Sequence, residues 1–133
     1  TALRAVLRAS DGVQTFALFG EGSVRGPVVT FAVDGLDSQL VAAALSAEHG
    51  IGVRAGKFCA HILVDTLLEE GSDEHDSAVR VSAGLASTPE HVARLVAAVT
   101  ALAADGPGAE YELTQQGWAP VDDTRELDAP LPW

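Results

Sequence analysis

The chain has 133 residues, 47% of them hydrophobic and 20% charged, and its formal net charge at pH 7 is −11. This length and composition are typical of one globular domain with its own core and exclude a disordered chain. The acidic excess over only 8 lysine and arginine residues argues against nucleic acid or an anionic membrane as a partner. A single cysteine excludes an internal disulfide, and the cysteine and histidine spacing of a zinc site is missing.

No apolar run is as long as a membrane-spanning helix, and no signal peptide is visible. Together with the single cysteine, this predicts a reducing, cytoplasmic setting. The sequence lacks methionine and opens within a predicted helix, since Leu3, Val6 and Leu7 share one helical face from the first residues. We therefore expect a fragment of a longer polypeptide, cut on its N-terminal side.

The first third of the chain predicts a helix followed by two strands. Residues 1–9 suit a short amphipathic helix, and the aromatic and β-branched residues of 13–19 suit a strand. The glycine-rich segment 20–27 lacks the lysine and hydroxyl ending of a phosphate-binding loop and precedes a strand, so we predict a flexible connection. The nearly continuous apolar run 28–33 predicts the most central strand.

The second helix has clear signals at both ends. Asp37 is the predicted N-cap, and Gly50 lies where the chain turns left-handed to end the helix. Residues 51–53 then form a short apolar run, and 60–68 predict a third helix after the turn that contains the cysteine. The predicted buried stripe of the second helix comprises Leu40, Val41, Ala44 and Leu45.

An acidic segment, 69–76, precedes the last strand and helix. Its carboxylates lack the spacing of a calcium loop, so we predict a solvated linker. Residues 78–85 predict a strand, and Thr88 caps a fourth helix that continues to Gly106. The proline-containing tail 110–133 is expected to pack as an extended strap on a domain formed by 1–109.

The order of the predicted elements is helix, strand, strand, helix, short strand, helix, strand, helix. This order predicts an α+β fold, a two-layer sandwich in which helices cover a small, mostly antiparallel sheet.

The turn between the second and third helices contains the chain's only cysteine and only lysine, Cys59 and Lys57. Neighbouring cations and a following helix N-terminus stabilise a thiolate, which favours an exposed, reactive sulfur at Cys59. A free cysteine is more often a small buried hydrophobe, so a packing role for Cys59 stays open.

Two blocks of sequence form a recognisable pattern. Residues 50–60 read Gly-Ile-Gly-Val-Arg-Ala-Gly-Lys-Phe-Cys-Ala, and farther on Arg80 and Ser82 are followed by Thr88 and Glu90. With these blocks, the chain from about residue 12 to 102 resembles the C-terminal small domain of class V, fold-type I pyridoxal-phosphate enzymes. Within that class it is most similar to cysteine desulfurases and selenocysteine lyases.

The resemblance implies roles for three residues. Cys59 is the expected catalytic nucleophile that accepts sulfur, and Arg80 is expected to bind the carboxylate of an amino-acid substrate such as cysteine. Arg54 is a second substrate-binding candidate, although a role in bracing the turn is favoured. No residue of this chain is expected to bind a cofactor or a metal.

The resemblance also implies partners. Pyridoxal phosphate would be bound by a large domain of the same polypeptide that precedes this segment, so the chain alone would be inactive. Lys57 lies in the wrong block to form the Schiff base with this cofactor and is interpreted as a flanking cation. A sulfur-acceptor protein and a second copy in a homodimer are further implied partners of the intact enzyme.

The sequence departs from the family pattern beside the cysteine. The family has histidine before the cysteine and Gln-Pro after the alanine, whereas here Phe58 precedes Cys59 and His61 follows Ala60. Two alternatives therefore stay open: a class V aminotransferase, epimerase or C–S lyase without a thiol nucleophile, and a stand-alone interaction module. A surface ion pair with the acidic linker is the alternative role of Arg80.

Overall fold

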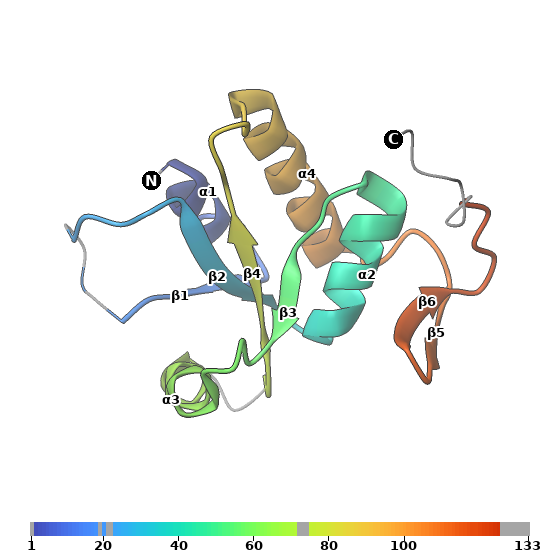
Figure 1. Ribbon diagram of the computed structural model, residues 1–133, viewed down its shortest axis with the longest axis horizontal. Helices are drawn as coiled ribbons and strands as arrows, with labels where there is room; N and C mark the ends of the chain where they lie inside the picture. The colour runs from blue at the N-terminus through green and yellow to red at the C-terminus, as the bar shows by residue number, and fades with distance from the viewer. Residues whose placement is uncertain (1, 19, 21–22, 72–74, 126–133) are drawn as a thin grey trace.

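The computed structural model describes residues 2–18, 20, 23–71 and 75–125 of the chain. These residues form four α-helices and six β-strands (Figure 1). In chain order the elements are α1 (Ala2–Arg8), β1 (Val13–Phe16), β2 (Val28–Val33), α2 (Ser38–His49), β3 (Arg54–Gly56), α3 (His61–Gly71), β4 (Ala78–Ser82), α4 (Pro89–Asp105), β5 (Tyr111–Thr114) and β6 (Gly117–Pro120).

Four of the strands form one antiparallel sheet in the order β1-β2-β4-β3. The apolar run of β2 lies inside this sheet, paired with β1 on one side and β4 on the other, as its composition predicted. The sheet and its covering helices confirm the predicted α+β fold and the order of its first eight elements.

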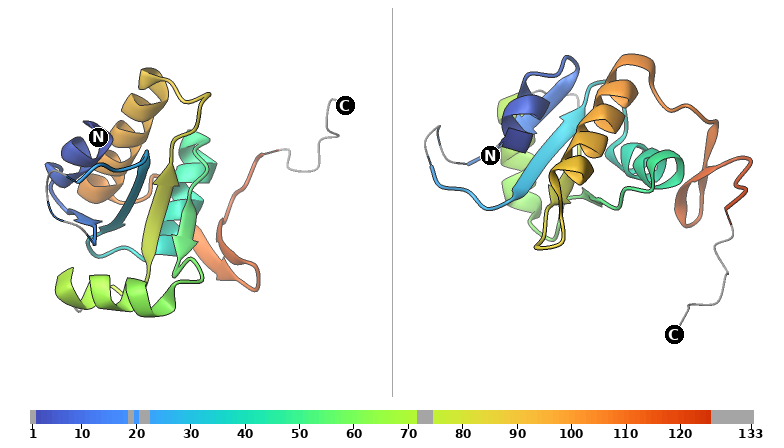
Figure 2. Two further views of the ribbon diagram at one scale, coloured as in Figure 1. Left: turned by 60° about the vertical axis from the view of Figure 1, so that its left-hand side comes forward. Right: turned by 90° about the horizontal axis from the view of Figure 1, so that it is seen from above.

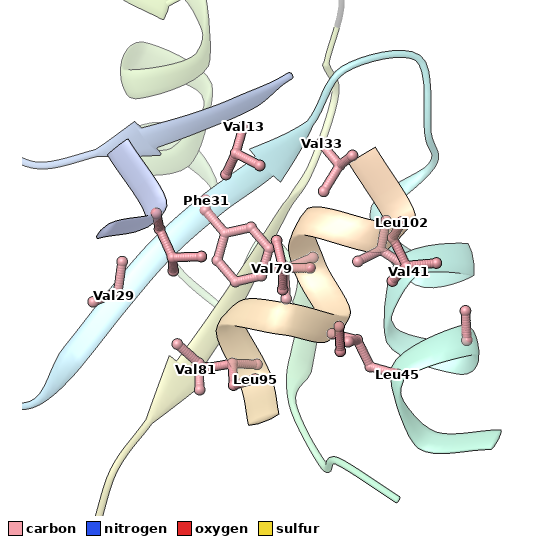
Figure 3. Close-up of a cluster of buried hydrophobic side chains, with 14 of the residues drawn as sticks. Val13, Val29, Phe31, Val33, Val41, Leu45, Val79, Val81, Leu95 and Leu102 are labelled. Carbon is pink, nitrogen blue, oxygen red and sulfur yellow. The ribbon is translucent and has the colours of Figure 1, made fainter. Parts of the chain in front are cut away.

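The main core lies between one face of the sheet and the helices α1, α2 and α4 (Figure 3). Phe31 of β2 is fully buried at its centre, and Val79 and Val99 contribute from β4 and α4. Burial of these side chains is the main favourable term in folding, at roughly 1.5–3 kcal/mol for each large apolar residue. The other labelled core residues are Val13, Val29, Val33, Val41, Leu45, Val81, Leu95 and Leu102.

A second, smaller core lies on the opposite face of the sheet. Helix α3 contributes Val64 and Leu68, which pack on Ala78 of β4, with Phe16 and Phe58 at the margin. The left view of Figure 2 shows α3 set apart from the other three helices. Because α3 follows the cysteine turn directly, this second core places that turn against the sheet.

The helix ends agree with the sequence signals. The Asp37 side chain accepts hydrogen bonds from the backbone of Gln39 and Leu40, and Gly50 ends α2 in the left-handed conformation at φ 63°. Thr88 caps α4, with His91 completing the capping box. One detail of the buried stripe of α2 differs, because Leu40 is only half-buried while Ser38 is buried.

Several strand and helix boundaries differ from the prediction. The first strand ends at Phe16, and the short strand before the cysteine lies at 54–56 instead of 51–53. Helix α3 continues to Gly71, into the segment predicted to be an acidic linker, while 72–74 lie outside the described residues. The pairing of β3 with β4 and the packing of α3 determine these boundaries, and local composition does not predict either contact.

The tail is not an extended strap where the structure describes it. Strands β5 and β6 pair as an antiparallel hairpin that lies beside α2, on the side away from the main sheet (Figure 1). Gly117 has a φ of 115°, a conformation that favours glycine, and the Thr114 hydroxyl donates to its carbonyl across the turn. Residues 126–133 of the predicted strap lie outside the described part.

Glu48 of α2 holds the hairpin in place. Its carboxylate accepts hydrogen bonds from the backbone of Gly108 and Ala109 and from the hydroxyl of Tyr111. Burial raises the pKa of the Tyr111 hydroxyl, and the hydrogen bond to Glu48 raises it further. Among the described residues, no helix is both long and apolar enough to cross a membrane.

Candidate functional site

Cys59 lies in a tight turn between β3 and α3. The backbone N–H of Ala60 donates to the carbonyl of Lys57 at 2.8 Å, which closes the turn around Phe58 and Cys59. Both central residues have positive φ, 53° at Phe58 and 59° at Cys59, as in a type I′ turn. A left-handed backbone costs L-residues other than glycine about 1–2 kcal/mol each, so the turn is strained.

The thiol of Cys59 is exposed. The structure therefore corrects the alternative in which the cysteine is a buried packing residue. Cys59 precedes the first turn of α3, where the backbone N–H of Val64 donates to the carbonyl of Ala60. The turn thus displays Cys59 next to a helix N-terminus, as the sequence predicted.

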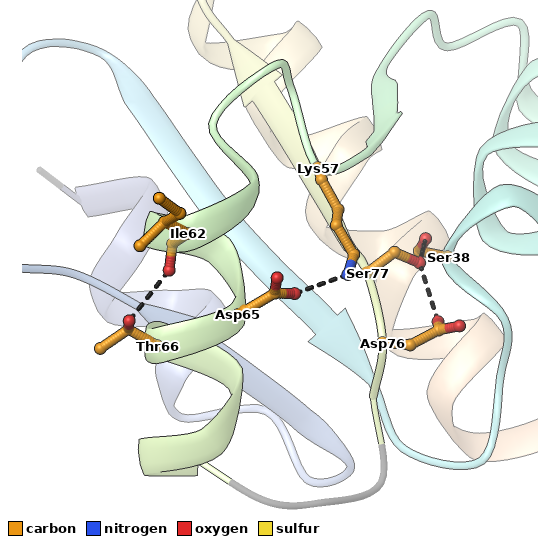
Figure 4. Close-up of polar contacts among 7 residues, drawn as sticks. All are labelled: Ser38, Lys57, Ile62, Asp65, Thr66, Asp76 and Ser77. Atoms are coloured by element: carbon orange, nitrogen blue, oxygen red, sulfur yellow. Dashed lines mark hydrogen bonds and ion pairs between the residues drawn. The ribbon is translucent and has the colours of Figure 1, made fainter.

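Two neighbouring side chains hold the turn in place. The ammonium of Lys57 donates to the carboxylate of Asp65 on α3 at 2.6 Å, which ties the start of the turn to the helix (Figure 4). Phe58 packs on the second core. Because the charge of Lys57 is paired with Asp65, it is not a free cation beside the thiol.

Arg80 occupies the centre of β4 on the same face of the sheet as the second core. Cross-strand partners share a face, and the register places Phe16, Thr30, Arg80 and Arg54 in one row across β1, β2, β4 and β3. The two candidate arginines are therefore direct cross-strand neighbours.

Arg80 lies over the ring of Phe58, with the guanidinium carbon 5.1 Å from the ring centroid. This distance is within the range of a cation–π contact. The Nε of Arg80 is buried and has no hydrogen-bond partner among the described residues. Within the described part of the chain, neither Arg80 nor Arg54 forms an ion pair, so the alternative of a surface ion pair for Arg80 has no support there.

Two arginines at directly opposite strand positions, with no ion pair to a described carboxylate, make this face receptive to an anion. Like charges directly opposite on neighbouring strands destabilise a sheet, and a bound anion relieves that repulsion. Arginine binds a carboxylate through two parallel hydrogen bonds, which lysine cannot reproduce. Arg54 is exposed and Arg80 is half-buried, so Arg80 is the better desolvated of the two.

The structure links the predicted nucleophile to the predicted carboxylate-binding residue through Phe58. Phe58 precedes Cys59 in the chain and its ring contacts the guanidinium of Arg80, so the turn that carries the thiol also contacts Arg80. Sequence reasoning did not assign a role to Phe58 or to Asp65. The replacement of the family's histidine by Phe58 was the one available signal, and the Asp65 contact depends on the fold of the turn.

The acidic linker has its own local contacts. Ser77 donates to Asp76 and shares a hydrogen bond with Ser38 at the start of α2 (Figure 4). The side chain of His75 is 6% exposed, and its Nε2 lies 3.6 Å from the carboxylate of Asp34. Across the described residues, no group of three or more histidine, cysteine or acidic side chains is arranged to hold a metal ion.

Pyridoxal phosphate does not fit the part of the chain that the structure describes. The cofactor needs a lysine to form a Schiff base, and the only lysine, Lys57, is engaged by Asp65. The glycine-rich loop ahead of β2 leads into a strand and not into a helix N-terminus, where phosphates bind.

Comparison with known proteins agrees with this architecture. The family model described as aminotransferase class-V matches residues 1–95. A segment of 72 residues is 39% identical to a probable cysteine desulfurase of Vibrio cholerae serotype O1; it covers 54% of this chain and 16% of that relative. The chain therefore corresponds to a small part of the relative's length. The matched residues contain the whole four-stranded sheet and the Cys59 turn, while the β5–β6 hairpin lies beyond them. On this match, the chain belongs to the aminotransferase class-V family.

Proposed function

We propose that this chain is the C-terminal small domain of a pyridoxal-phosphate-dependent, cysteine desulfurase-like enzyme. One observation carries the proposal: the exposed thiol of Cys59 lies on a strained turn whose Phe58 ring contacts Arg80, which forms no ion pair among the described residues. A nucleophile next to a carboxylate-binding cation suits an enzyme that acts on the sulfur of an amino acid. The similarity to a probable cysteine desulfurase supports the same function.

Arg80 binds the substrate carboxylate in this proposal. The contact with the Phe58 ring engages the face of the guanidinium and none of its hydrogen-bond donors, which suits pairing with a carboxylate. Arg54, directly opposite on β3, adds a second positive charge and so favours an anionic ligand over a neutral one. Its exposure makes it the weaker contact.

Cys59 accepts the sulfur. Its Sγ forms a bond to the sulfur of the substrate cysteine while the substrate's Cβ–S bond breaks, and the carbon takes up a proton. The products are a persulfide on Cys59 and alanine, so atoms and electrons balance without an external oxidant. No other side chain in this cluster can accept sulfur, and the exposure of Cys59 leaves its persulfide accessible to a separate acceptor protein.

The cofactor would be bound by a separate large domain of the same polypeptide, because the described residues of this chain do not fit it. The intact enzyme would be a homodimer, following the resemblance to its family, in the cytoplasmic setting that the single cysteine and the missing signal peptide predict. This assignment makes the chain inactive on its own.

The nearest alternative is a class V aminotransferase, epimerase or C–S lyase, which would use Arg80 but not the thiol. The test is Cys59→Ala in the enzyme that carries this domain together with its cofactor-binding domain. We expect alanine release from cysteine to be abolished, with cofactor content and its absorption spectrum unchanged. Near-normal alanine release from cysteine would refute the desulfurase assignment; cysteine must be the substrate, because the weaker carbon–selenium bond of selenocysteine can break without a thiol.

Arg80 is tested in the same enzyme. Arg80→Ala should weaken amino-acid binding by about 2–5 kcal/mol, the range for truncating one partner of a desolvated charge pair. Arg80→Lys is the matched control for charge and should recover only part of the loss, because lysine lacks the planar fork. Unchanged binding in both variants would remove Arg80 from the site. Failure to find a cofactor-binding domain on the same polypeptide would favour the stand-alone interaction module.

A further inference from the structure

The position before the cysteine, Phe58, has three properties that set it apart. It has positive φ without being glycine, it packs on the second core, and its ring lies under the guanidinium of Arg80. A strained backbone conformation persists only where surrounding contacts enforce it. The closed hydrogen bond of the turn and the pair between Lys57 and Asp65 are those contacts.

The environment of Arg80 explains what the ring does. The like-charged Arg54 lies directly opposite Arg80 in the strand pair, and the Nε of Arg80 is buried without a hydrogen-bond partner among the described residues. No carboxylate among the described residues holds it. The negative face of an aromatic ring attracts a cation without occupying its hydrogen-bond donors. Phe58 therefore fixes the guanidinium without accepting a hydrogen bond from it.

We propose that Phe58 is a positioning residue that holds Arg80 ready for the substrate carboxylate. Because Phe58 is bonded to Cys59, the same residue fixes where that carboxylate lies relative to the thiol. The inference rests on the proposed function for the identity of the ligand, an amino acid with a free carboxylate. A side chain that is held in place before binding loses less conformational freedom on binding, which raises affinity.

Phe16 supplies a matched control. It is the other aromatic residue at the margin of the second core, and it lies in the same cross-strand row, two strands away from Arg80. Phe16→Leu and Phe58→Leu remove the same ring from the same small core. Only Phe58→Leu removes the stacking partner of Arg80.

The kinetic test uses the enzyme that carries this domain with its cofactor. Phe58→Leu should raise both KM for cysteine and the inhibition constant of alanine about fivefold, the order expected for a partly buried cation–π contact. The value of kcat should change less than about twofold, because the contact acts on binding of the carboxylate. Phe58→Tyr keeps an aromatic face and should restore both constants, while Phe16→Leu should leave them unchanged.

A second substitution separates the ring's charge distribution from its volume. Incorporation of 3,4,5-trifluorophenylalanine at position 58 keeps the packing but withdraws electron density from the ring face. It should raise the same two constants in the direction of Phe58→Leu. If Phe58→Leu folds poorly, the fluorinated variant still tests whether the ring positions Arg80. Constants equal to those of the wild type with the fluorinated ring would overturn the proposal, as would equal effects of Phe58→Leu and Phe16→Leu.

A readout that does not depend on activity uses the 133-residue chain itself. The ring current of Phe58 should displace the nuclear magnetic resonance signals of the Arg80 side chain, and Phe58→Leu should remove that displacement while Phe16→Leu retains it. Arg80 signals that are unaffected by Phe58→Leu would overturn the contact. Failure of this proposal is distinguishable from failure of the proposed function. Near-normal alanine release by Cys59→Ala refutes the desulfurase function, whereas the Arg80 resonances and the inhibition constant of alanine test the role of Phe58 alone.

Discussion

The strain in the cysteine turn leads to a quantitative prediction about stability. Cys59 has a φ of 59°, so any L-residue at this position is held in the left-handed region. That conformation costs about 1–2 kcal/mol for a residue with a Cβ and almost nothing for glycine. The greater freedom of glycine in the unfolded chain offsets about 0.4–1 kcal/mol of this gain. Cys59→Gly should therefore be more stable than Cys59→Ala by about 1 kcal/mol.

The comparison of these two variants isolates the backbone, because both lack the thiol. Urea unfolding of the chain followed by circular dichroism measures the difference, which should appear as a midpoint shift of about 0.3–1 M with an unchanged slope. Ala101, exposed on α4, is the control position. Ala101→Gly should lower the free energy of unfolding by about 1 kcal/mol, since glycine weakens a helix interior.

The test depends on whether the exchange of alanine for glycine raises or lowers the free energy of unfolding. Exchange of alanine for glycine should stabilise at position 59 and destabilise at position 101. If Cys59→Ala is as stable as Cys59→Gly or more stable, the residue does not hold a positive φ in solution. The argument that the turn stores strain beside the nucleophile would then be wrong.

Three further predictions concern the hairpin and the lysine. Glu48→Gln should lower the free energy of unfolding by about 1–2 kcal/mol and speed hydrogen exchange at Gly108, because the carboxylate accepts hydrogen bonds from the hairpin segment; slow exchange in the variant would refute this. Tyr111, the only tyrosine, should titrate by ultraviolet absorbance well above the ordinary pKa of about 10. Because the pKa of Tyr111 is raised in the folded state, its protonated hydroxyl contributes stability below pH 10, and this contribution is lost as the pH rises through the folded-state pKa. A titration midpoint at the ordinary value would contradict the burial of the hydroxyl. Pyridoxal phosphate and borohydride should not label Lys57 stoichiometrically, because the glycine-rich loop leads into a strand and not into a helix N-terminus that would bind the phosphate, and because Asp65 pairs with the lysine. A stoichiometric adduct in the mass spectrum that resists competing amines would show that the described residues do form a cofactor site.

Local sequence predicted most of the helices because helix ends are encoded in few residues. Asp37 and Gly50 bound α2 where expected, since a side-chain cap and a left-handed glycine act within a few residues of the helix. The strand of 28–33 was equally clear, because a strand buried inside a sheet needs a continuous apolar run. The strap predicted for the tail was wrong at residues 111–120, where pairing between β5 and β6 and contacts with α2 determine the structure.

The candidate site, too, could be predicted only in part from the sequence. The sequence by itself determined that Cys59 lies in a turn before a helix and that Arg80 lies on a strand, because turn residues and hydrophobic alternation are local signals. Only the tertiary structure decided that Arg54 and Arg80 are opposite one another, that Phe58 stacks under Arg80, and that Asp65 pairs with Lys57. These contacts depend on strand register and on the docking of α3, which arise from the packing of segments distant in the sequence.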